Sequence, residues 1–432
     1  MTQALTQSLC VRRPQARLRI WCAWILAAVV LAILPDIFDS NVALTSMSLM
    51  GTMAIYALSY NMLLGETGLL SFGHAVYYGL GGFFAVHLMN LVEATGLPIP
   101  LAVFPLAGGL GGLLVAAVFG SVATRRAGTA FAMITLGLCE LVASSSLILR
   151  HFFGGEQGVG TDRTGLFHPF GLTFGPQIQV FYLIAFWGFV SAAAMYALTQ
   201  TPFGRICRAV RDNPERAQFI GYRVRTVRFL AFTLSGFFAG IAGALVAINF
   251  ELVSVSQLGI QQSGAVILMT FIGGVGDFVG PILGAIVVTY LQINLSNLTS
   301  VWQLYLGLLF IGIVMFAPEG LAGILRKQWP LLTGRKIHSV LPAYLAALIA
   351  GGIAMAGLAM MIEMTNQVTM NAAEGLRMSL FHVEFSAAAP APWVIAALLA
   401  AGGGGAFIKA GRWARDAYGT ALEAARTLGE GT

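Results

Sequence analysis

Six polar residues lie in stretches of the chain that are otherwise apolar. Five of them fall in one short segment interrupted by glycines: Asn61, Glu66, Thr67, Ser71 and His74. The sixth, Glu140, lies near the middle of an apolar run over 129–149. Glycine-rich interruptions at membrane depth often bind solutes through helix ends, and a helix N-terminus favours a carboxylate. These six residues are therefore candidates for lining the path of a small solute.

A solute path is one of several roles that these residues could have. The segment 61–74 falls where the chain turns between two apolar runs, so its polar side chains could simply be exposed at the cytoplasmic mouth of a membrane protein. A proton relay between Glu66 and His74 is a further alternative. A carboxylate at the bilayer centre costs at least about 2.5 kcal/mol. Glu140 is therefore expected to face the interior of a helix bundle, either as a pathway or interface residue or in a structural hydrogen bond.

Composition places the whole chain in a membrane. Of its 432 residues, 57% are hydrophobic and 10% are charged, against about 25% charged in soluble domains. Such a surface would expose large apolar patches in water, which excludes a soluble enzyme and a disordered chain. Cys10, Cys22, Cys139 and Cys207 are scattered with no metal-ligand spacing. We therefore expect no metal site and no disulfide framework.

The apolar runs predict an all-α polytopic membrane protein with about 10–12 transmembrane helices. They cover residues 20–35, 42–64, 69–92, 98–123, 129–149, 178–199, 229–250, 263–292, 301–325, 340–362 and 392–410. An arginine-rich cytoplasmic segment, 1–19, precedes the first run. No small-residue cleavage site follows that run, so we interpret it as an uncleaved anchor.

Basic residues give the expected orientation. If both termini are cytoplasmic, 21 of the 24 lysines and arginines lie inside, all except Arg150, Arg163 and Arg377. The net charge of +6 is then a topology signal and predicts no nucleic-acid partner. The same rule requires 263–292 to cross twice or not at all. A break is expected at its glycine-rich elbow, and we predict two half-length helices on either side. The elbow comprises Gly273, Gly274, Gly276, Asp277, Gly280 and Pro281.

The loop over 200–228 is predicted to be cytoplasmic and to carry a short helix. Asn213 suits an N-cap, Pro214 the first helical position, and Glu215 the positive helix end. Gly221 suits the position after the last turn. A rigid capped helix of about two turns over 214–220 can transmit a push. The alternative is a solvated basic loop that enforces topology and contacts anionic lipid.

Several stretches resemble the permease subunits of branched-chain amino-acid type ABC transporters. They are FGRICRAVRDNPERAQFIGYRVRTVRFLAFTLSGFFAGIAGAL from Phe203, NMLLGETGLLSFGHAVYYGLGGF, MITLGLCELV, LMTFIGGVGDFVGPILGA and FAPEGLAGI. The matches run in order over about residues 40–325. Thr135, Leu136 and Glu140 also match a T-L-x-x-x-E pattern of that family.

The resemblance implies a non-enzymatic transport subunit in the bacterial cytoplasmic (inner) membrane. Implied partners are a second homologous permease subunit, two cytoplasmic ATP-binding subunits and an extracytoplasmic solute-binding protein. ATP and Mg²⁺ would bind the ATPase subunits, because this chain has no P-loop motif. The short cytoplasmic helix would dock on an ATPase. The residues implicated in that coupling are Arg208, Asp212, Asn213, Pro214, Glu215, Arg216, Ala217 and Gly221.

The implied solutes are branched-chain or other hydrophobic amino acids, with urea, amides and aromatic acids as alternatives within the family. A different class remains open, an ion-coupled secondary transporter or channel using Glu66, Glu140 and Asp277, although no inverted repeat is visible. The resemblance ends near residue 327. We expect a permease domain over 20–327 and an extension over 328–432, with two further crossings and an amphipathic cytoplasmic tail over 412–428.

Overall fold

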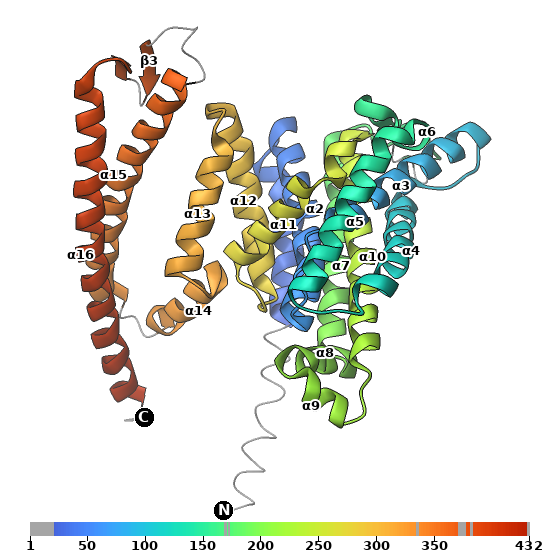
Figure 1. Cartoon of the computed structure of the whole chain (residues 1–432), viewed down its shortest axis with the longest axis horizontal. Helices are drawn as coiled ribbons and strands as arrows, with labels where there is room; N and C mark the ends of the chain where they lie inside the picture. Colours follow the sequence, from blue (N-terminus) through green and yellow to red (C-terminus); the bar gives the residue numbers. More distant parts are fainter. Residues whose placement is uncertain are drawn as a thin grey trace, which may run out of the picture. The chain divides into compact units, whose positions relative to one another are not determined.

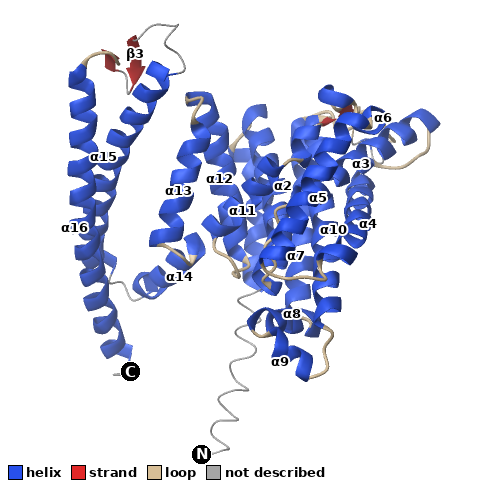
Figure 2. Ribbon diagram, viewed as in Figure 1, coloured by secondary structure: helices blue, strands red, loops and turns tan. Residues whose placement is uncertain are grey.

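The structure is a computed structural model that describes residues 21–167, 171, 173–333, 337–369, 377–380 and 383–429. The predicted N-terminal segment 1–19 lies outside the described residues. Helices dominate the described part of the chain (Figure 2). The chain divides into two compact units. The first is Met1–Leu295 with Leu306–Ala322, and the second is Ser296–Tyr305 with Gly323–Thr432.

A helix over Trp21–Ile37 comes first among the described residues. The next helices are α2 (Asn41–Thr67), α3 (Ala75–Thr95), α4 (Phe104–Ala123), α5 (Thr129–Ile148), α6 (Arg150–Phe153), α7 (Gln177–Gln200), α8 (Pro202–Asp212), α9 (Pro214–Phe219) and α10 (Val224–Phe250). They are followed by α11 (Ile260–Gly273), α12 (Val279–Leu298), α13 (Trp302–Phe316), α14 (Gly320–Thr333), α15 (Ile337–Thr369) and α16 (Pro390–Gly429).

Nine of the described helices are long and apolar enough to cross a membrane, and a tenth span results if the bent pair α13 and α14 counts as one. The helices Trp21–Ile37 and α11 are apolar but shorter. The prediction of an all-α polytopic membrane protein is confirmed.

Several predicted helices differ from the observed ones in their limits, and three of these differences bear on the site. Helix α3 begins at Ala75, six residues later than predicted, and Gly68 in a left-handed conformation (φ 70°) ends α2. The run 301–325 forms two helices, since Pro318 follows the end of α13. On either side of the predicted elbow, α11 has 14 residues but α12 has 20. The expectation of two half-length helices is therefore wrong for α12, which is long enough to span.

Helix α10 lies at the centre of the first unit, against α2, α3 and α4 (Figure 1). Glycines bring these backbones close together. A Cβ atom at Gly243 would overlap the carbonyl oxygen of Tyr78 on α3, and one at Gly112 on α4 would lie 3.0 Å from the Cα atom of Gly240 on α10. Small residues are the usual means of packing membrane helices, because lipid supplies no hydrophobic driving force between them.

Two short antiparallel strands connect loops at the other end of the first unit from α8. Strand β1 (Val159–Gly160) pairs with β2 (Leu252–Val253). Arg163 supports this loop by an ion pair with Glu251 at 3.0 Å between Nε and Oε1. The charge map predicts that both loops are extracytoplasmic.

In the second unit, α15 and α16 form a long hairpin closed by strands β3 (Arg377–Leu380) and β4 (Val383–Ser386). The predicted crossing 392–410 and the predicted separate tail helix 412–428 are one continuous helix of 40 residues, α16. This correction reflects the absence of a proline after Pro392 and the helix-compatible residues Lys409–Arg415. At about 1.5 Å per residue, α16 is about twice as long as the ~30 Å hydrocarbon core.

The glycine contacts of α10 give a direct stability prediction. Gly243→Ala should lower the thermal unfolding midpoint in detergent, with a loss of about 1–3 kcal/mol, because the new methyl group overlaps backbone atoms of α3. Gly264→Ala on α11 is the matched control, since its Cβ would meet nothing within 4 Å. This control should be neutral or stabilising by up to about 1 kcal/mol. Equal midpoints for the two variants would contradict the packing of α10.

Candidate functional site

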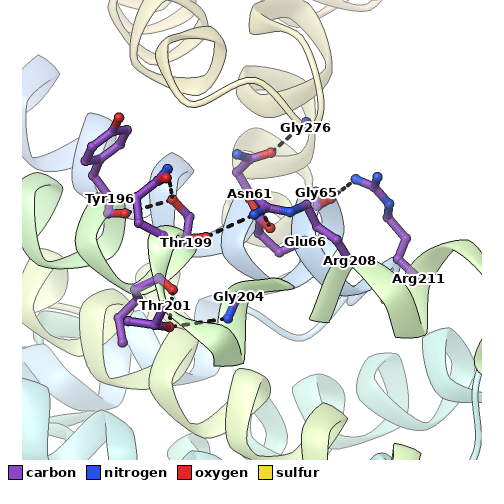
Figure 3. Close-up of polar contacts among 12 residues, drawn as sticks. Asn61, Gly65, Glu66, Tyr196, Thr199, Thr201, Gly204, Arg208, Arg211 and Gly276 are labelled. Carbon is purple, nitrogen blue, oxygen red and sulfur yellow. Dashed lines mark hydrogen bonds and ion pairs between the residues drawn. The ribbon is translucent and has the colours of Figure 1, made fainter. Parts of the chain in front are cut away.

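The last two turns of α2 connect two distant parts of the chain. Asn61 contacts the break between α11 and α12, and the end of the same helix contacts two arginines of α8 (Figure 3). The charge map predicts that this end of α2 is cytoplasmic. Helix α8, the predicted elbow and part of the predicted solute path therefore meet at one place.

Asn61 satisfies the backbone of the broken helix. Its side-chain nitrogen donates to the carbonyl oxygen of Asp277 at 3.0 Å, and its side-chain oxygen accepts from the backbone N–H of Gly276 at 3.0 Å. Gly276 and Gly274 have φ values of 87° and 119°, which favour glycine. Broken backbone in a membrane protein has to find partners inside the protein. Asn61 supplies both kinds of partner from one buried side chain.

Arg211 caps the end of α2. Its guanidinium donates to the carbonyl oxygen of Gly65, and its Nε also contacts Asp212 Oδ1 at 3.0 Å. A cation near the last carbonyl groups complements the negative end of a helix. Gly68, the C-cap residue of α2, lies under this side chain, since a Cβ there would be 3.0 Å from Arg211 Cγ.

Arg208 links three helices. Its Nη1 pairs with Glu66 Oε2 on α2 at 3.3 Å, and its Nη2 donates to the carbonyl oxygen of Thr199 on α7 at 3.0 Å. The Glu66 side chain is 12% exposed and that of Arg208 is 38% exposed. The carboxylate is therefore mostly removed from solvent and has its countercharge on α8.

Helices α8 and α9 each begin with an N-cap residue whose side chain accepts a hydrogen bond from the first turn. Thr201 is the N-cap of α8 and accepts from Gly204 N, with Pro202 in the first turn. Asn213 ends α8 and is also the N-cap of α9, where its Oδ1 accepts from Arg216 N at 2.9 Å. The predicted helix after Asn213 is confirmed. Helix α8 was missed, although Thr201-Pro202 repeats the signal that identified Asn213-Pro214.

The α8–α9 pair is packed against the start of α10. Cys207, Val210 and Ala217 form one buried cluster with Val227 and Ala231. Burial, followed by the charge of Glu66, raises the pKa of the Cys207 thiol to about 12, so this thiol is uncharged at neutral pH. The two short helices are thus held to the bundle by apolar packing as well as by the two arginines.

Ala217 requires a correction. It was expected among the residues that couple to an ATPase, but its side chain is only 3% exposed and faces the cluster on α10. The outward side of this segment is instead apolar at Phe219 and Ile220, which are 91% and 70% exposed. The sequence places Ile220 on the predicted helix, but neither residue was singled out. A pair of large apolar residues at the end of a capped helix that is predicted to be cytoplasmic is the signal that could have identified them.

The other residues that are predicted to couple to an ATPase lie at the surface or at the ends of α8 and α9. Asp212, Glu215 and Arg216 are exposed, and Pro214 is partly buried in the first turn of α9. Gly221 follows α9 with φ 100°, a conformation that L side chains rarely adopt.

His74 and Ser71 belong to a separate buried cluster in the connection between α2 and α3. His74 Nε2 lies 2.9 Å from Ser59 Oγ, and its ring contacts those of Tyr56 and Tyr60. The Ser71 carbonyl oxygen accepts from the Tyr60 hydroxyl at 3.1 Å. None of these described contacts joins His74 to Glu66. The geometry gives no support to a proton relay between them.

Thr67 is also buried and donates to Leu63 O within its own helix. One described cleft, at the opposite end of α2, is lined by Asp39, Asn41, Arg163 and Gln177 among others. None of the six predicted path residues lines it. Asn61 and Glu66 join α2 to other parts of the chain, Ser71 and His74 join the α2–α3 connection to α2, and Thr67 bonds only within α2 among the described contacts.

Glu140 requires a second correction. It was expected to face the bundle interior, but it lies on the exposed side of α5. The inward side of α5 carries Thr135, Cys139 and Val142, and the 3.6-residue period places Glu140 outside that side. Among the described residues no group of three His, Cys, Asp or Glu side chains could hold a metal ion.

Comparison with known proteins places most of the first unit in one family. Residues 42–318 match the family described as branched-chain amino acid transport system / permease component. The chain is 29% identical over 307 residues to the high-affinity branched-chain amino acid transport system permease protein LivM of Escherichia coli K12, covering 65% of this chain and 70% of the relative. The LivM protein of Salmonella typhimurium is 28% identical over 305 residues, with the same shares covered.

More distant relatives carry other solutes in their names. The ribose import permease protein RbsC of Haemophilus influenzae is 26% identical over 309 residues, covering 68% of this chain and 90% of the relative. No solved structure matches the chain significantly. The family match spans well over half of the 432 residues and coincides with the multi-span helical unit. The chain belongs to the family of permease components of branched-chain amino acid transport systems and is a multi-pass protein of the inner membrane.

Proposed function

We propose that this permease subunit works in an ATP-driven importer and that α8 and α9 form its docking element for a cytoplasmic ATPase subunit. The observation that carries this proposal is the exposure of Phe219 and Ile220 at the end of two capped, packed helices. Exposed aromatic and aliphatic side chains on a rigid support are typical anchors of protein interfaces. Arg205 on α8 and Arg216 on α9 are also exposed and would add complementary charge.

A movement of the docked helices would reach the membrane through α2. Arg208 and Arg211 join α8 to Glu66 and Gly65, and Asn61, one helical turn earlier, joins α2 to the broken segment. The two left-handed glycines in that break allow the backbone to rearrange at little steric cost. We propose that this line of contacts transmits ATP-driven closure of the motor to the break and switches the permease between outward and inward access.

The proposed partners are those of an importer with a separate motor. They are two ATPase subunits that bind ATP and Mg²⁺, a second homologous permease and an extracytoplasmic solute-binding protein. The absence of a P-loop motif from the chain supports a separate motor. The loop that carries β1 and Arg163, which forms an ion pair with Glu251, is the proposed contact for the binding protein.

Branched-chain amino acids are the proposed solutes, with other hydrophobic amino acids next. The LivM relatives support this assignment, whereas the RbsC relative makes a sugar the second candidate. Urea, amides and aromatic acids remain outcomes of the same uptake test. An ion-coupled carrier is less well supported, because Glu66 is paired with Arg208 and Glu140 lies on the outer side of α5.

Uptake by purified components tests the function directly. The chain, reconstituted in liposomes with its ATPase, second permease and binding protein, should accumulate leucine, isoleucine and valine only when ATP is present on the ATPase side. Accumulation of ribose, urea, an amide or an aromatic acid in place of these solutes would overturn the proposed substrate. Solute uptake by this chain alone, driven by an ion gradient without ATP, would overturn the importer assignment.

Phe219 tests the docking surface. Phe219→Asp should lower co-purified ATPase and ATP-dependent uptake by about tenfold or more, the effect of losing one anchor residue. Phe219→Leu is the matched control, since it keeps an apolar side chain and should retain most of both activities. Neither substitution should change the amount of chain in the membrane, because this side chain is 91% exposed.

Ala217→Asp tests the packing of α9 against the bundle, whereas Phe219→Asp tests its docking to the ATPase. It buries a carboxylate among Cys207, Val210 and Val227, so it should lower the amount of folded chain. Normal uptake by Phe219→Asp would show that the outward side of α9 does not contact the motor.

A further inference from the structure

We propose that the exposed side of α5 around Glu140 packs against a transmembrane helix of a second, non-identical permease, and that this partner helix carries a hydrogen-bond donor or a cation for the Glu140 carboxylate. The proposal rests on the proposed function, because it assigns the surface by which this subunit meets the other permease.

One side of α5 is unoccupied by the rest of the described unit. Its residues follow helical spacing and are Ala130, Met133, Gly137, Glu140, Ser144 and Leu147. The other side packs inward through Phe131, Thr135, Cys139 and Val142. Met133 is 65% exposed and Leu147 is 59% exposed. The face therefore runs almost the full length of the 20-residue span.

The small residues on this face recur every seven positions, at Ala130, Gly137 and Ser144. A Cβ at Gly137 would meet nothing within 4 Å, so no described helix of the first unit packs on this glycine. By contrast, a Cβ at Gly243 on α10 would overlap the backbone of Tyr78 on α3, whereas Gly264 on α11 is as open as Gly137. A seven-residue repeat of small side chains suits the close approach of another membrane helix.

The Glu140 carboxylate requires a hydrogen-bond donor or a cation on the helix that packs against this face of α5. It lies 11 residues after Thr129, at about 16 Å along a span that crosses about 30 Å of hydrocarbon. The described ion pairs of the chain do not include it. Along its own face the adjacent turns present Met133, Gly137 and Ser144, which bring no cation. A carboxylate at this depth needs a donor from a neighbouring protein, because lipid tails offer none.

Charge also selects between the possible neighbours. If a second copy packed through the same face about a twofold axis, Glu140 would approach Glu140 of that copy. Two carboxylates in a low-dielectric interface disfavour each other unless a proton is shared. A different chain with a basic or donor residue at the same depth satisfies the carboxylate directly. The face is therefore suited to a heteromeric pair of permeases.

Site-specific cross-linking in the complete complex tests this surface. The change Leu141→p-benzoylphenylalanine places a photoreactive group beside Glu140, and Leu114→p-benzoylphenylalanine places one on the exposed face of α4 as a control. Illumination of cells should join position 141 to a chain that peptide sequencing identifies as another member of the same permease family. The control should give no such product.

Glu140→Leu and Glu140→Gln test the carboxylate itself. Glu140→Leu should lower the amount of co-purified second permease by about tenfold or more, because the partner's donor or cation is left without a counterpart. Glu140→Gln keeps a hydrogen-bond acceptor and should retain clearly more of it. Equal recovery for the two variants and the unaltered chain would overturn the role of Glu140.

The cross-linking outcomes also separate this inference from the proposed function. A product with a second copy of this chain, with the α15–α16 hairpin of the same chain, or with no protein would overturn the heteromeric surface. If ATPase still co-purifies and Phe219→Asp still lowers uptake, the importer assignment stands in those cases. Loss of ATP dependence in the unaltered complex would instead remove the proposed function itself.

Discussion

The two hydrogen bonds of Asn61 to the broken segment are the contacts on which the rest of this site depends. A helix that stops inside a membrane protein leaves N–H and C=O groups that lipid cannot satisfy. Asn61 meets this constraint with one donor and one acceptor, at Asp277 O and Gly276 N. The same helix then ends at Gly68, where its last turn is held by arginines from α8. One helix end thus contacts both the broken segment and α8.

The centre of the first unit and its α8–α9 end are held by different kinds of contact. The centre is held by glycine-mediated contact of α10 with its neighbours, where the close approach of backbones leaves little freedom to move. The α8–α9 end is held by a small apolar cluster and by polar contacts that can be exchanged for water. A bundle that is stiff at its centre and attached by exchangeable contacts at one end suits a protein that must receive a mechanical signal. The exposed residues Phe219 and Ile220 lie at that end.

Features encoded locally could be predicted from the sequence, whereas those that depend on tertiary packing could not. Asn213 supplies the N-cap and Pro214 the first helical residue of α9, so the sequence predicts this helix almost to the residue. The elbow at Gly273–Gly280 breaks a helix wherever it is placed. The inward direction of Ala217 and the outward direction of Glu140 depend on which side of each helix meets α10 or the rest of the bundle. The partnership of Glu66 with Arg208 joins residues 142 positions apart, which spacing alone cannot show.

In the proposed mechanism Glu66 and Arg208 act as one contact between the motor-facing helix and the membrane. A double-mutant cycle of Glu66→Gln and Arg208→Gln, measured as leucine uptake per ATP hydrolysed in the reconstituted complex, tests it most directly. We expect each single change to lower this ratio, and the double variant to be no worse than the more damaged single variant, because contacting residues couple by about 0.5–3 kcal/mol. Independent effects that multiply in the double variant, or single variants with an unchanged ratio, would contradict this mechanism.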